Sequence, residues 1–460
     1  MMLDISLQNL AKILGAGYQG NSEVKASGVA IDSRRVQKGD LFFALPGEKV
    51  DGHEFIDEAL AKGAVGAVIS DVNLVKAPED KNLIICRNPL KLLQDLAKLV
   101  RQNTNIPVVA ITGSTGKTTT KDLIFSILSQ TYNCLKTEGN YNNELGLPLT
   151  LCKLNREHEA AVLEMGMRGL GQISFLCEIA QPTLGVITNI GQVHAELLGS
   201  QEKIAQAKAE LLEYLPPQGT VVLNIDAQSI LKHWLKNFQG QVLWFGLREE
   251  ADIRARNIQY LGEEGSKFTV IINEEEEEIT VNIPGEHNIL NALAGIGIAR
   301  TLGVGWEHIK RGLRQAQLTG MRLEILENDI GVKILNDTYN ANPTSMAASL
   351  KTLAHFSGTR KIAVLGDMYE LGIYEEEGHK LMGQIACREK VDLLVAVGNL
   401  GKLIGQGAIE AGLDPQKVVF AANNEDTARI LKGYLNKGDV VLVKGSRGMQ
   451  MEEIVNELMR

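Results

Sequence analysis

The chain alternates short, continuous apolar runs with longer segments in which apolar residues recur every three or four positions. A short apolar run without strict alternation is typical of a strand buried on both faces of a parallel sheet, and the longer period is typical of an amphipathic helix. The clearest predicted strands are 108–112, 160–165, 184–190 and 220–225, and then 331–337, 361–368, 391–398, 417–422 and 439–445. This alternation predicts an α/β fold with doubly wound, mainly parallel sheets.

Two polar stretches, 103–107 and 319–321, divide the chain into three units. The first unit mixes short predicted strands with helical segments, and the other two begin with a buried strand. We therefore predict a small α/β domain at 1–104, a central parallel-sheet domain at 105–318 and a C-terminal Rossmann-like domain at 319–460. The acidic run 274–278 lies between two strand-like segments and is predicted to be a solvated hairpin tip.

The stretch VVAITGSTGKTTTK, which begins at Val108, joins a predicted strand to a predicted helix through a glycine-containing turn. Such a turn lets backbone N–H groups approach a phosphate, and the helix N-terminus adds its positive dipole. A lysine here would reach the terminal phosphates and the next hydroxyl would ligate Mg²⁺. Ile111 replaces the first glycine of the longer GxxxxGK[ST] pattern, and a plain glycine-rich turn with a surface lysine is the alternative. The predicted nucleotide-binding residues of this phosphate loop are Gly113, Ser114, Thr115, Gly116, Lys117, Thr118 and Thr119.

The tetrapeptide NKGD at 436–439 matches the guanine-reading motif of GTPases. In those proteins the motif ends a strand, whereas here it precedes the predicted strand 439–445. A polar turn is expected at such a place, so the sequence does not favour a GTPase.

Two further candidates follow predicted strands of the central domain. Glu164 ends the strand 160–165, which would place a carboxylate beside the phosphate loop, where it can hold Mg²⁺. The alternative is a strand-end carboxylate that faces solvent. His194 follows the strand 184–190 at the edge where ligands of parallel sheets bind, but a lone histidine is often structural.

Lys208 occupies an unusual position on a predicted helix. It lies four residues after Ile204 and four before Leu212, so it shares their apolar face. A buried lysine is costly unless it is paired or modified. From the pattern alone, a side chain that extends its amine to solvent is the favoured interpretation.

Charge and cysteine content narrow the class of protein. The net charge of -9 and the pI near 5.6 argue against a nucleic-acid partner. The five cysteines are scattered and form no CxxC pair, as in a reduced cytosolic protein. The first 20 residues do not have the pattern of a signal peptide, and no run approaches the length of a membrane span. We therefore expect a cytoplasmic protein.

Taken together, these segments resemble the Mur ligases, ATP-dependent amide ligases that build the peptide of bacterial cell-wall precursors. The similarity runs almost end to end and in the family's order, through TGSTGKTTTK, GNYNNELGLPLT, VLEMGMRGLGQI, TNIGQVHAELLGS, IAQAKAEL, PGEHNILNALAG and TGMRLE. The opening segment 32–55 is similar to the uridine-nucleotide domain of members that act late in the pathway. Segments 335–350, 364–372 and 441–449 look most like the last of them, although Tyr369 stands where an aliphatic residue is usual.

The resemblance implies a reaction. The last member adds D-alanyl-D-alanine to UDP-N-acetylmuramoyl-tripeptide: ATP converts the carboxylate to an acyl phosphate, and the dipeptide amine then displaces phosphate. The implied cofactors are two Mg²⁺ ions and a CO₂ molecule bound as a lysine carbamate. The implied architecture is a uridine-nucleotide domain, a central P-loop ATPase domain and a Rossmann-like domain for the incoming dipeptide, and we expect a monomer.

The resemblance also implies site residues. Lys117, Glu164, His194 and Lys208 would be catalytic, and Thr118, Glu164, His194 and carbamylated Lys208 would serve the metal sites, which reverses the pattern-based interpretation of Lys208. Asn288 would contact adenine, with His287 and Asn291 nearby; Arg322 would reach the phosphates and Asp337 the ribose. The implied substrate-binding residues are Asp32, Ser33, Arg34, Asp51, His53, Asn142, Asn143, Asn340 and Asn342.

Three alternatives stay open. The preceding ligase adds the third amino acid to the muramoyl dipeptide, but its motif for an amino acid with a second charged end is not evident near 370–410. A folate-polyglutamating ligase shares the ATP core without the uridine-type domain. A non-catalytic nucleotide-binding regulator could lose Lys208 and His194, which are both present here. The sequence leaves open whether the third peptide residue is diaminopimelate or lysine.

Overall fold

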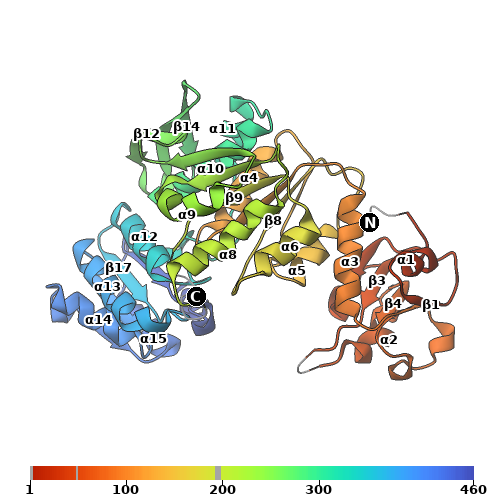
Figure 1. The fold of residues 1–460 in the computed structure, drawn as a ribbon. Coiled ribbons are helices and arrows are strands. Elements are labelled where there is room, and N and C mark those ends of the chain that lie inside the picture. Colours follow the sequence, from red (N-terminus) through yellow and green to blue (C-terminus); the bar gives the residue numbers. More distant parts are fainter. Residues whose placement is uncertain (1–3, 48–49, 192–197) are drawn as a thin grey trace.

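Three β-sheets organise the protein in a computed structural model that describes residues 4–47, 50–191 and 198–460 (Figure 1). The N-terminal sheet has the order β1-β5-β4-β3-β2, parallel except for the β1–β5 pair. Its strands are β1 (Gly17–Gln19), β2 (Gly28–Ala30), β3 (Asp40–Phe43), β4 (Gly66–Ile69) and β5 (Leu83–Ile85), and its helices are α1 (Leu7–Ile13) and α2 (Ile56–Ala61).

The central sheet has nine strands in the order β14-β13-β12-β11-β10-β9-β6-β8-β7. In this order, all neighbouring strands from β12 through β6 to β7 are parallel, and β12, β13 and β14 form an antiparallel extension. The strands are β6 (Val108–Thr112), β7 (Cys134–Lys136), β8 (Ala160–Glu164), β9 (Leu184–Ile187), β10 (Thr220–Asn224), β11 (Gln241–Gly246), β12 (Ile253–Tyr260), β13 (Ser266–Ile272) and β14 (Glu275–Val281).

Helices cover both faces of this sheet, as the continuous apolar runs predict. Successive residues of β6 enter opposite cores: Val108 and Ala110 face one, and Val109 and Ile111 face the other. The first core is closed by α5 (Gly146–Leu151), α6 (Gln172–Ala180), α8 (Gln201–Tyr214) and α9 (Gln228–Leu235), and the second by α4 (Lys117–Leu128), α10 (Glu286–Thr301) and α11 (Trp306–Arg314).

The acidic run is only partly the predicted hairpin tip. The turn consists of Asn273 and Glu274, both with positive φ, whereas 275–278 belong to β14. Three of these glutamates pair with cations, in the ion pairs Glu275–Arg300, Glu277–Lys310 and Glu278–Lys267. Pairing with neighbouring cations therefore allows four successive acids to continue a strand.

The C-terminal sheet has the order β15-β16-β20-β17-β18-β19 and is parallel except at β15. Its strands are β15 (Glu324–Glu327), β16 (Lys333–Asn336), β17 (Lys361–Leu365), β18 (Leu393–Val397), β19 (Val418–Ala421) and β20 (Val440–Lys444). Helices α12 (Pro343–Ala354), α13 (Glu375–Arg388), α14 (Gly401–Glu410), α15 (Asn424–Tyr434) and α16 (Glu452–Leu458) enclose two separate cores on its faces. The NKGD segment forms the turn before β20, where buried Asp439 pairs with Arg360.

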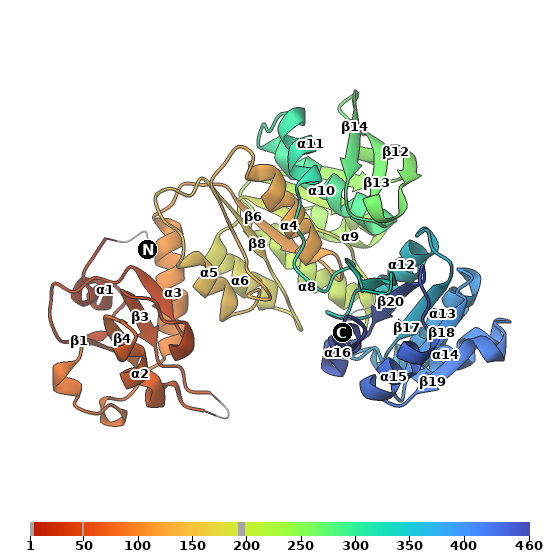
Figure 2. The same cartoon turned by 180° about the vertical axis from the view of Figure 1, so that it is seen from behind.

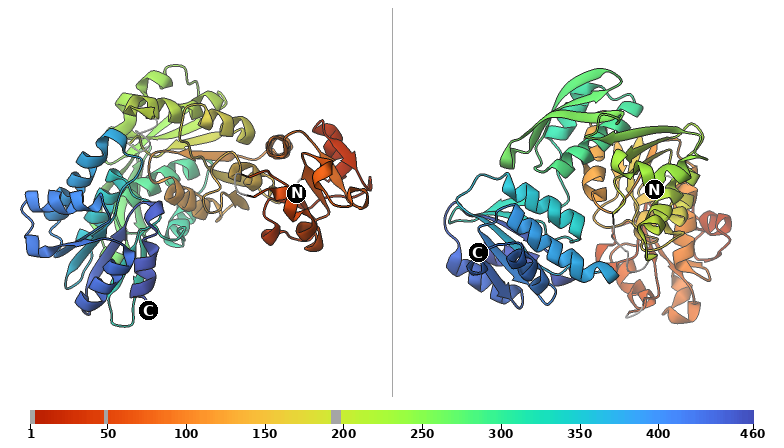
Figure 3. Two further views of the ribbon diagram at one scale, coloured as in Figure 1. Left: turned by 90° about the horizontal axis from the view of Figure 1, so that it is seen from below. Right: turned by 60° about the vertical axis from the view of Figure 1, so that its left-hand side comes forward.

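Helix α3 (Pro89–Gln102) joins the N-terminal sheet to the central one. Figures 2 and 3 show the N-terminal domain projecting from the central domain at the end where α3 lies. Its apolar residues Leu93 and Leu96 belong to one continuous core that includes Phe43 of β3 and Leu163 of β8. The C-terminal sheet has its own cores and lies at the other end of the central domain.

The five cysteines are free, and burial raises the pKa of Cys134 and of Cys152 to about 12. Among the residues that the structure describes, no helix is both long and apolar enough to cross a membrane.

Candidate active site

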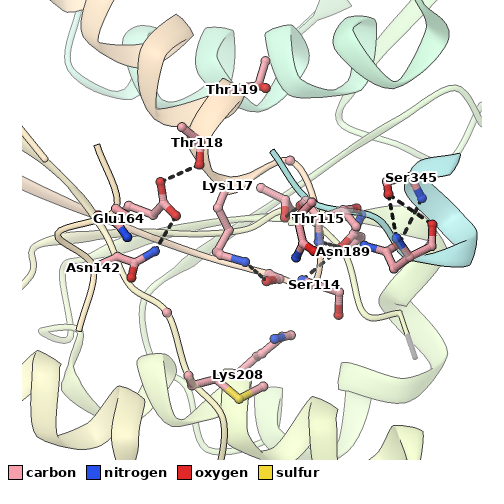
Figure 4. A pocket seen from close by; sticks show the side chains of 18 of the residues that line it. Ser114, Thr115, Lys117, Thr118, Thr119, Asn142, Glu164, Asn189, Lys208 and Ser345 are labelled. Atoms are coloured by element: carbon pink, nitrogen blue, oxygen red, sulfur yellow. Dashed lines mark hydrogen bonds between the residues drawn. The ribbon is translucent and has the colours of Figure 1, made fainter. Parts of the chain in front are cut away.

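A cavity of about 1010 Å³ lies at the junction of the central and C-terminal domains. It collects residues from distant parts of the chain: the phosphate loop, the ends of β8 and β9, helix α8, the start of α10, the linker at 322–323 and helix α12. Most of the predicted site residues of these two domains line it. The cavity is therefore our candidate active site (Figure 4).

The phosphate loop adopts the turn that its glycines permit. Gly113 has φ +149, and a Cβ there would lie 1.9 Å from Thr188 Oγ1. Gly116 has φ +78 and precedes α4, which begins at Lys117. Lys117 Nζ donates a 2.8 Å hydrogen bond to the carbonyl oxygen of Gly113, so the amine folds back over the loop.

Asn189 holds this loop from the end of β9, a contact that the sequence did not reveal. Its side-chain oxygen accepts hydrogen bonds from the backbone N–H groups of Ser114 at 3.1 Å and Thr115 at 2.9 Å. Thr188 Oγ1 donates to the carbonyl oxygen of Thr115. Two loop donors are thus satisfied without a phosphate.

Glu164 lies at the carboxyl end of β8 with only 3% of its surface exposed. Its Oε2 accepts a 2.8 Å hydrogen bond from Thr118 Oγ1, and its Oε1 accepts one of 2.8 Å from Asn142 Nδ2. In the described part of the chain, no group of three or more His, Cys, Asp or Glu side chains could hold a metal ion by itself. A Mg²⁺ ion bound through one carboxylate, one hydroxyl and substrate phosphates nevertheless fits this donor set.

Lys208 is buried, with 1% of its surface exposed, and it lines the cavity from α8. Burial, and then the positive charge of Lys117, hold the pKa of the Lys208 amine well below its usual value. The helical pattern thus placed Lys208 correctly on the inward face, but the interpretation favoured from that pattern alone, an amine extended to solvent, is wrong. His194, the remaining predicted metal ligand, lies outside the described residues.

The predicted adenine residues lie together on the first turns of α10. Asn291 Nδ2 donates to Asn288 Oδ1 at 3.0 Å, and Thr120 Oγ1 donates to Asn291 Oδ1 at 3.1 Å. His287 is adjacent in the cavity wall, and burial lowers its pKa to about 4.

Asp337, at the end of β16, makes an ion pair with buried Lys444 at 2.5 Å and accepts from Ser349 Oγ at 2.6 Å. Lys444 was not among the predicted site residues. Arg322 stacks its guanidinium over the Tyr339 ring, 4.2 Å from the centroid. All five side chains line the cavity.

Three predicted substrate asparagines have local structural contacts. Asn143 accepts from the backbone N–H groups of Leu145 and Gly146. Asn342 caps α12, and the Asn340 carbonyl oxygen accepts from Lys444 Nζ at 3.0 Å. These asparagines line the cavity, so the contacts that they make also fix the positions of its walls.

The predicted uridine-site residues do not line this cavity. Asp32 pairs with Arg34 at 2.9 Å next to buried Ser33, and Asp51 contacts His53 Nδ1 at 2.6 Å. The other His53 nitrogen accepts the backbone N–H of Ser70, so both ring nitrogens are engaged within the domain. They belong to the N-terminal sheet domain, which Figure 1 shows apart from the C-terminal domain.

Comparisons with known proteins decide the family. Three family models match the chain in succession. Residues 25–101 match the model described as "Mur ligase family, catalytic domain", residues 111–299 match "Mur ligase middle domain", and residues 321–447 match "Mur ligase, glutamate ligase domain". The chain is 38% identical to the UDP-N-acetylmuramoyl-tripeptide–D-alanyl-D-alanine ligase of Bacillus subtilis, over 99% of both chains. The chain belongs to the Mur ligase family.

Solved structures agree with this Mur ligase assignment. The UDP-N-acetylmuramoylalanyl-D-glutamyl-2,6-diaminopimelate–D-alanyl-D-alanyl ligase of Acinetobacter baumannii is 31% identical, covers 100% of this chain and 99% of its own, and has a TM-score of 0.86. The MurF ligase of Thermotoga maritima, solved in complex with ADP, is 29% identical, covers 95% of this chain and 97% of its own, and has a TM-score of 0.80. The predicted family, the three-domain α/β fold and ligase activity are confirmed.

Proposed function

We propose that this Mur ligase joins D-alanyl-D-alanine to the free carboxylate of UDP-N-acetylmuramoyl-tripeptide and converts ATP to ADP and phosphate. The observation that carries the proposal is the Glu164–Thr118 contact beside Lys117 in a cavity between two domains. The full-length similarity to ligases of this name supports the choice of substrates.

The phosphate loop would hold ATP. Backbone N–H groups from Gly116 to Thr119 would face the phosphates, and Lys117 would leave the Gly113 carbonyl to bind a terminal phosphate oxygen. Asn288 would bind adenine with Asn291 beside it, Asp337 would bind the ribose and Arg322 the phosphates. With these contacts, the base would lie toward α10 and the γ-phosphate toward Glu164 and Lys208.

Thr118 and Glu164 would hold Mg²⁺, with His194 and Lys208 serving a second ion. When bound, Mg²⁺ supplies positive charge that offsets the crowded phosphate oxygens. Glu164 would turn its buried carboxylate from the Thr118 hydroxyl to the ion, and Asn142 would keep the other carboxylate oxygen oriented.

Lys208 would carry a carbamate. Its buried amine has a lowered pKa, and a neutral amine is the form that attacks CO₂, with loss of one proton. The product is an anion with two oxygens, the donor type that Mg²⁺ prefers. An ammonium at the same place would repel the ion.

The domains would divide the substrates among them. Asp32, Ser33, Arg34, Asp51 and His53 would shape the uridine site of the domain at 1–104, and Asn142 and Asn143 would guide the peptide to the cavity. The domain at 319–460 would present the dipeptide amine, with Asn340 and Asn342 at the entrance. The amine would attack the acyl phosphate and release phosphate, and domain closure would exclude the water that hydrolyses this intermediate. We expect a cytoplasmic monomer.

Measurement of ADP release with each pair of substrates tests the proposal. Turnover is expected with a tripeptide nucleotide and D-alanyl-D-alanine, and tripeptides ending in diaminopimelate and in lysine should both be offered. ADP release with the dipeptide nucleotide and a free amino acid, but not with the first pair, would instead identify the preceding ligase.

A further inference from the structure

Asp122 ties the helix that follows the phosphate loop to the linker that leads into the C-terminal domain. Asp122 lies four residues after Thr118 on α4, so both side chains project from one face of the helix. Its buried Oδ2 accepts two hydrogen bonds from Thr319, one from the backbone N–H and one from Oγ1, both at 2.8 Å.

Two cations hold the Asp122 carboxylate in its charged form. Lys136 Nζ donates to Oδ1 at 2.9 Å, and Lys121 Nζ lies 3.3 Å from the same oxygen. Burial by itself would raise the pKa of Asp122, but the charge of Lys121 and the hydrogen bond from Lys136 outweigh it, and the pKa is lowered. Thr319 therefore donates to a charged acceptor, which makes a stronger hydrogen bond than a neutral one.

The linker after Thr319 has an unusual backbone. Met321 has φ +62 and Leu323 has φ +51, values that non-glycine residues rarely adopt. The C-terminal domain holds both residues: the Tyr339 N–H donates to the Met321 carbonyl at 3.2 Å, and the Leu323 N–H donates to Asp337 Oδ1 at 3.3 Å. The segment is thus fixed to the central domain at one end and to the C-terminal domain at the other.

Arg322 lies between these two positive-φ residues and lines the ATP cavity. Its guanidinium rests on the Tyr339 ring, and its Nε is buried and has no hydrogen-bond partner among the described residues. Arg322 and Lys117 line the same cavity, so both cations can face one bound anionic group. The place of Arg322 depends on where the linker begins, at Thr319, which Asp122 of α4 holds.

We infer that Asp122 is a positioning residue: through Thr319 it fixes the start of the linker and so places Arg322 in the wall of the cavity that holds the phosphate loop. This inference rests on the proposed function, because it assigns Arg322 to ATP.

The Thr319→Val variant tests this with the least disturbance, because valine keeps the side-chain shape and the backbone N–H but lacks the hydroxyl donor. Thr319→Val is expected to weaken binding of a non-hydrolysable ATP analogue and to lower kcat roughly tenfold, the size typical of a lost bond to a charged group. Thr319→Ser should restore most of this loss, and the affinity for the uridine nucleotide should not change.

Ser126→Ala is the matched control. Ser126 lies on the same helix and donates a 2.7 Å hydrogen bond to the Gly312 carbonyl of α11, away from the linker. Ser126→Ala should leave kcat and the affinity for the ATP analogue unchanged, while it lowers the melting temperature about as much as Thr319→Val does. Equal kinetic losses in Thr319→Val and Ser126→Ala would reduce the Asp122 contact to general support of the fold and overturn the inference.

A double-mutant cycle with Arg322→Ala asks whether the effect passes through Arg322. Thr319→Val should cost little once Arg322 is absent, whereas a full, additive loss would contradict the inference. Asp122→Asn, which leaves Lys121 and Lys136 without their counter-ion, should show the same kinetic pattern if it folds. Affinity for the ATP analogue does not depend on which amine is ligated, so failure of the proposed substrates and failure of this inference are distinguishable.

Discussion

Thr118 Oγ1 donates a 2.8 Å hydrogen bond to Glu164 Oε2 and so joins the first turn of α4 to the carboxyl end of β8. Both atoms are buried in the wall of a cavity that opens to a second domain. A cation that binds both oxygens would replace this hydrogen bond, and the hydroxyl would keep its hydrogen. The structure thus presents a hydroxyl and a carboxylate that are already at ligand spacing.

Glu164→Gln keeps the contact with Thr118 or Asn142 but removes the negative charge. We expect kcat to fall roughly 100-fold, the loss typical of one electrostatic contact in a transition state, and the Mg²⁺ concentration for half-maximal activity to rise. Exposed Glu157→Gln is the control and should behave as wild type. Unchanged Mg²⁺ dependence in Glu164→Gln would show that this carboxylate does not hold the metal.

Lys117→Ala should abolish ADP formation. The amine lies in the cavity and donates to the Gly113 carbonyl oxygen, a contact that a phosphate oxygen would replace, so its loss should cost roughly 100-fold or more in kcat. Binding of the uridine nucleotide, measured by calorimetry, should persist because its predicted site belongs to another domain. More than a small residual activity would contradict the role assigned to the lysine.

Lys208→Ala should lose activity that short carboxylic acids such as formate or acetate partly restore by occupying the vacated space. Lys208→Arg keeps a cation, cannot form the carbamate, and should be inactive with and without the acids. Near-normal turnover of the alanine variant would disprove the carbamate, and so would a high-resolution map with a bare ammonium beside bound ATP analogue and Mg²⁺.

His287 should make the protein less stable in acid. Its pKa falls from an ordinary 6.5 to about 4 in the folded state, chiefly through burial; Asp337 and Glu286 oppose the shift, and Lys444 adds to it. The unfolded chain therefore binds the proton first, so the stabilisation is complete above pH 6.5 and is lost as pH falls toward 4, by about 3 kcal/mol. Between pH 6.5 and 4, the melting temperature of His287→Gln should fall less steeply with decreasing pH than that of the wild type.

The sequence predicted residues whose role follows from a local pattern. The phosphate loop, Glu164 and the inward face of Lys208 all depend on a strand end or a helical period, and the structure places them in one cavity. Their chemical roles stay predictions, as do the domain boundaries. His194 lies outside the described residues and cannot be placed in this set.

The residues that the sequence did not reveal act through contacts between distant segments. Asn189, after β9, hydrogen-bonds to the phosphate loop, and Lys444 of β20 forms an ion pair with Asp337. Asp122 of α4 accepts hydrogen bonds from Thr319 at the start of the linker. No periodicity marks such pairs, because each partner is ordinary within its own element. The hairpin glutamates were misplaced for a related reason, since their cationic partners lie on other elements.

The continuous core through α3 has a consequence for heating. Because Leu93 and Leu96 pack in one cluster with both Phe43 and Leu163, the first two sheets should melt as a single cooperative unit. The C-terminal sheet encloses its own two cores and should melt independently. Calorimetry should then resolve two transitions rather than three, and a fragment of residues 1–319 should keep the first of them while it ligates nothing.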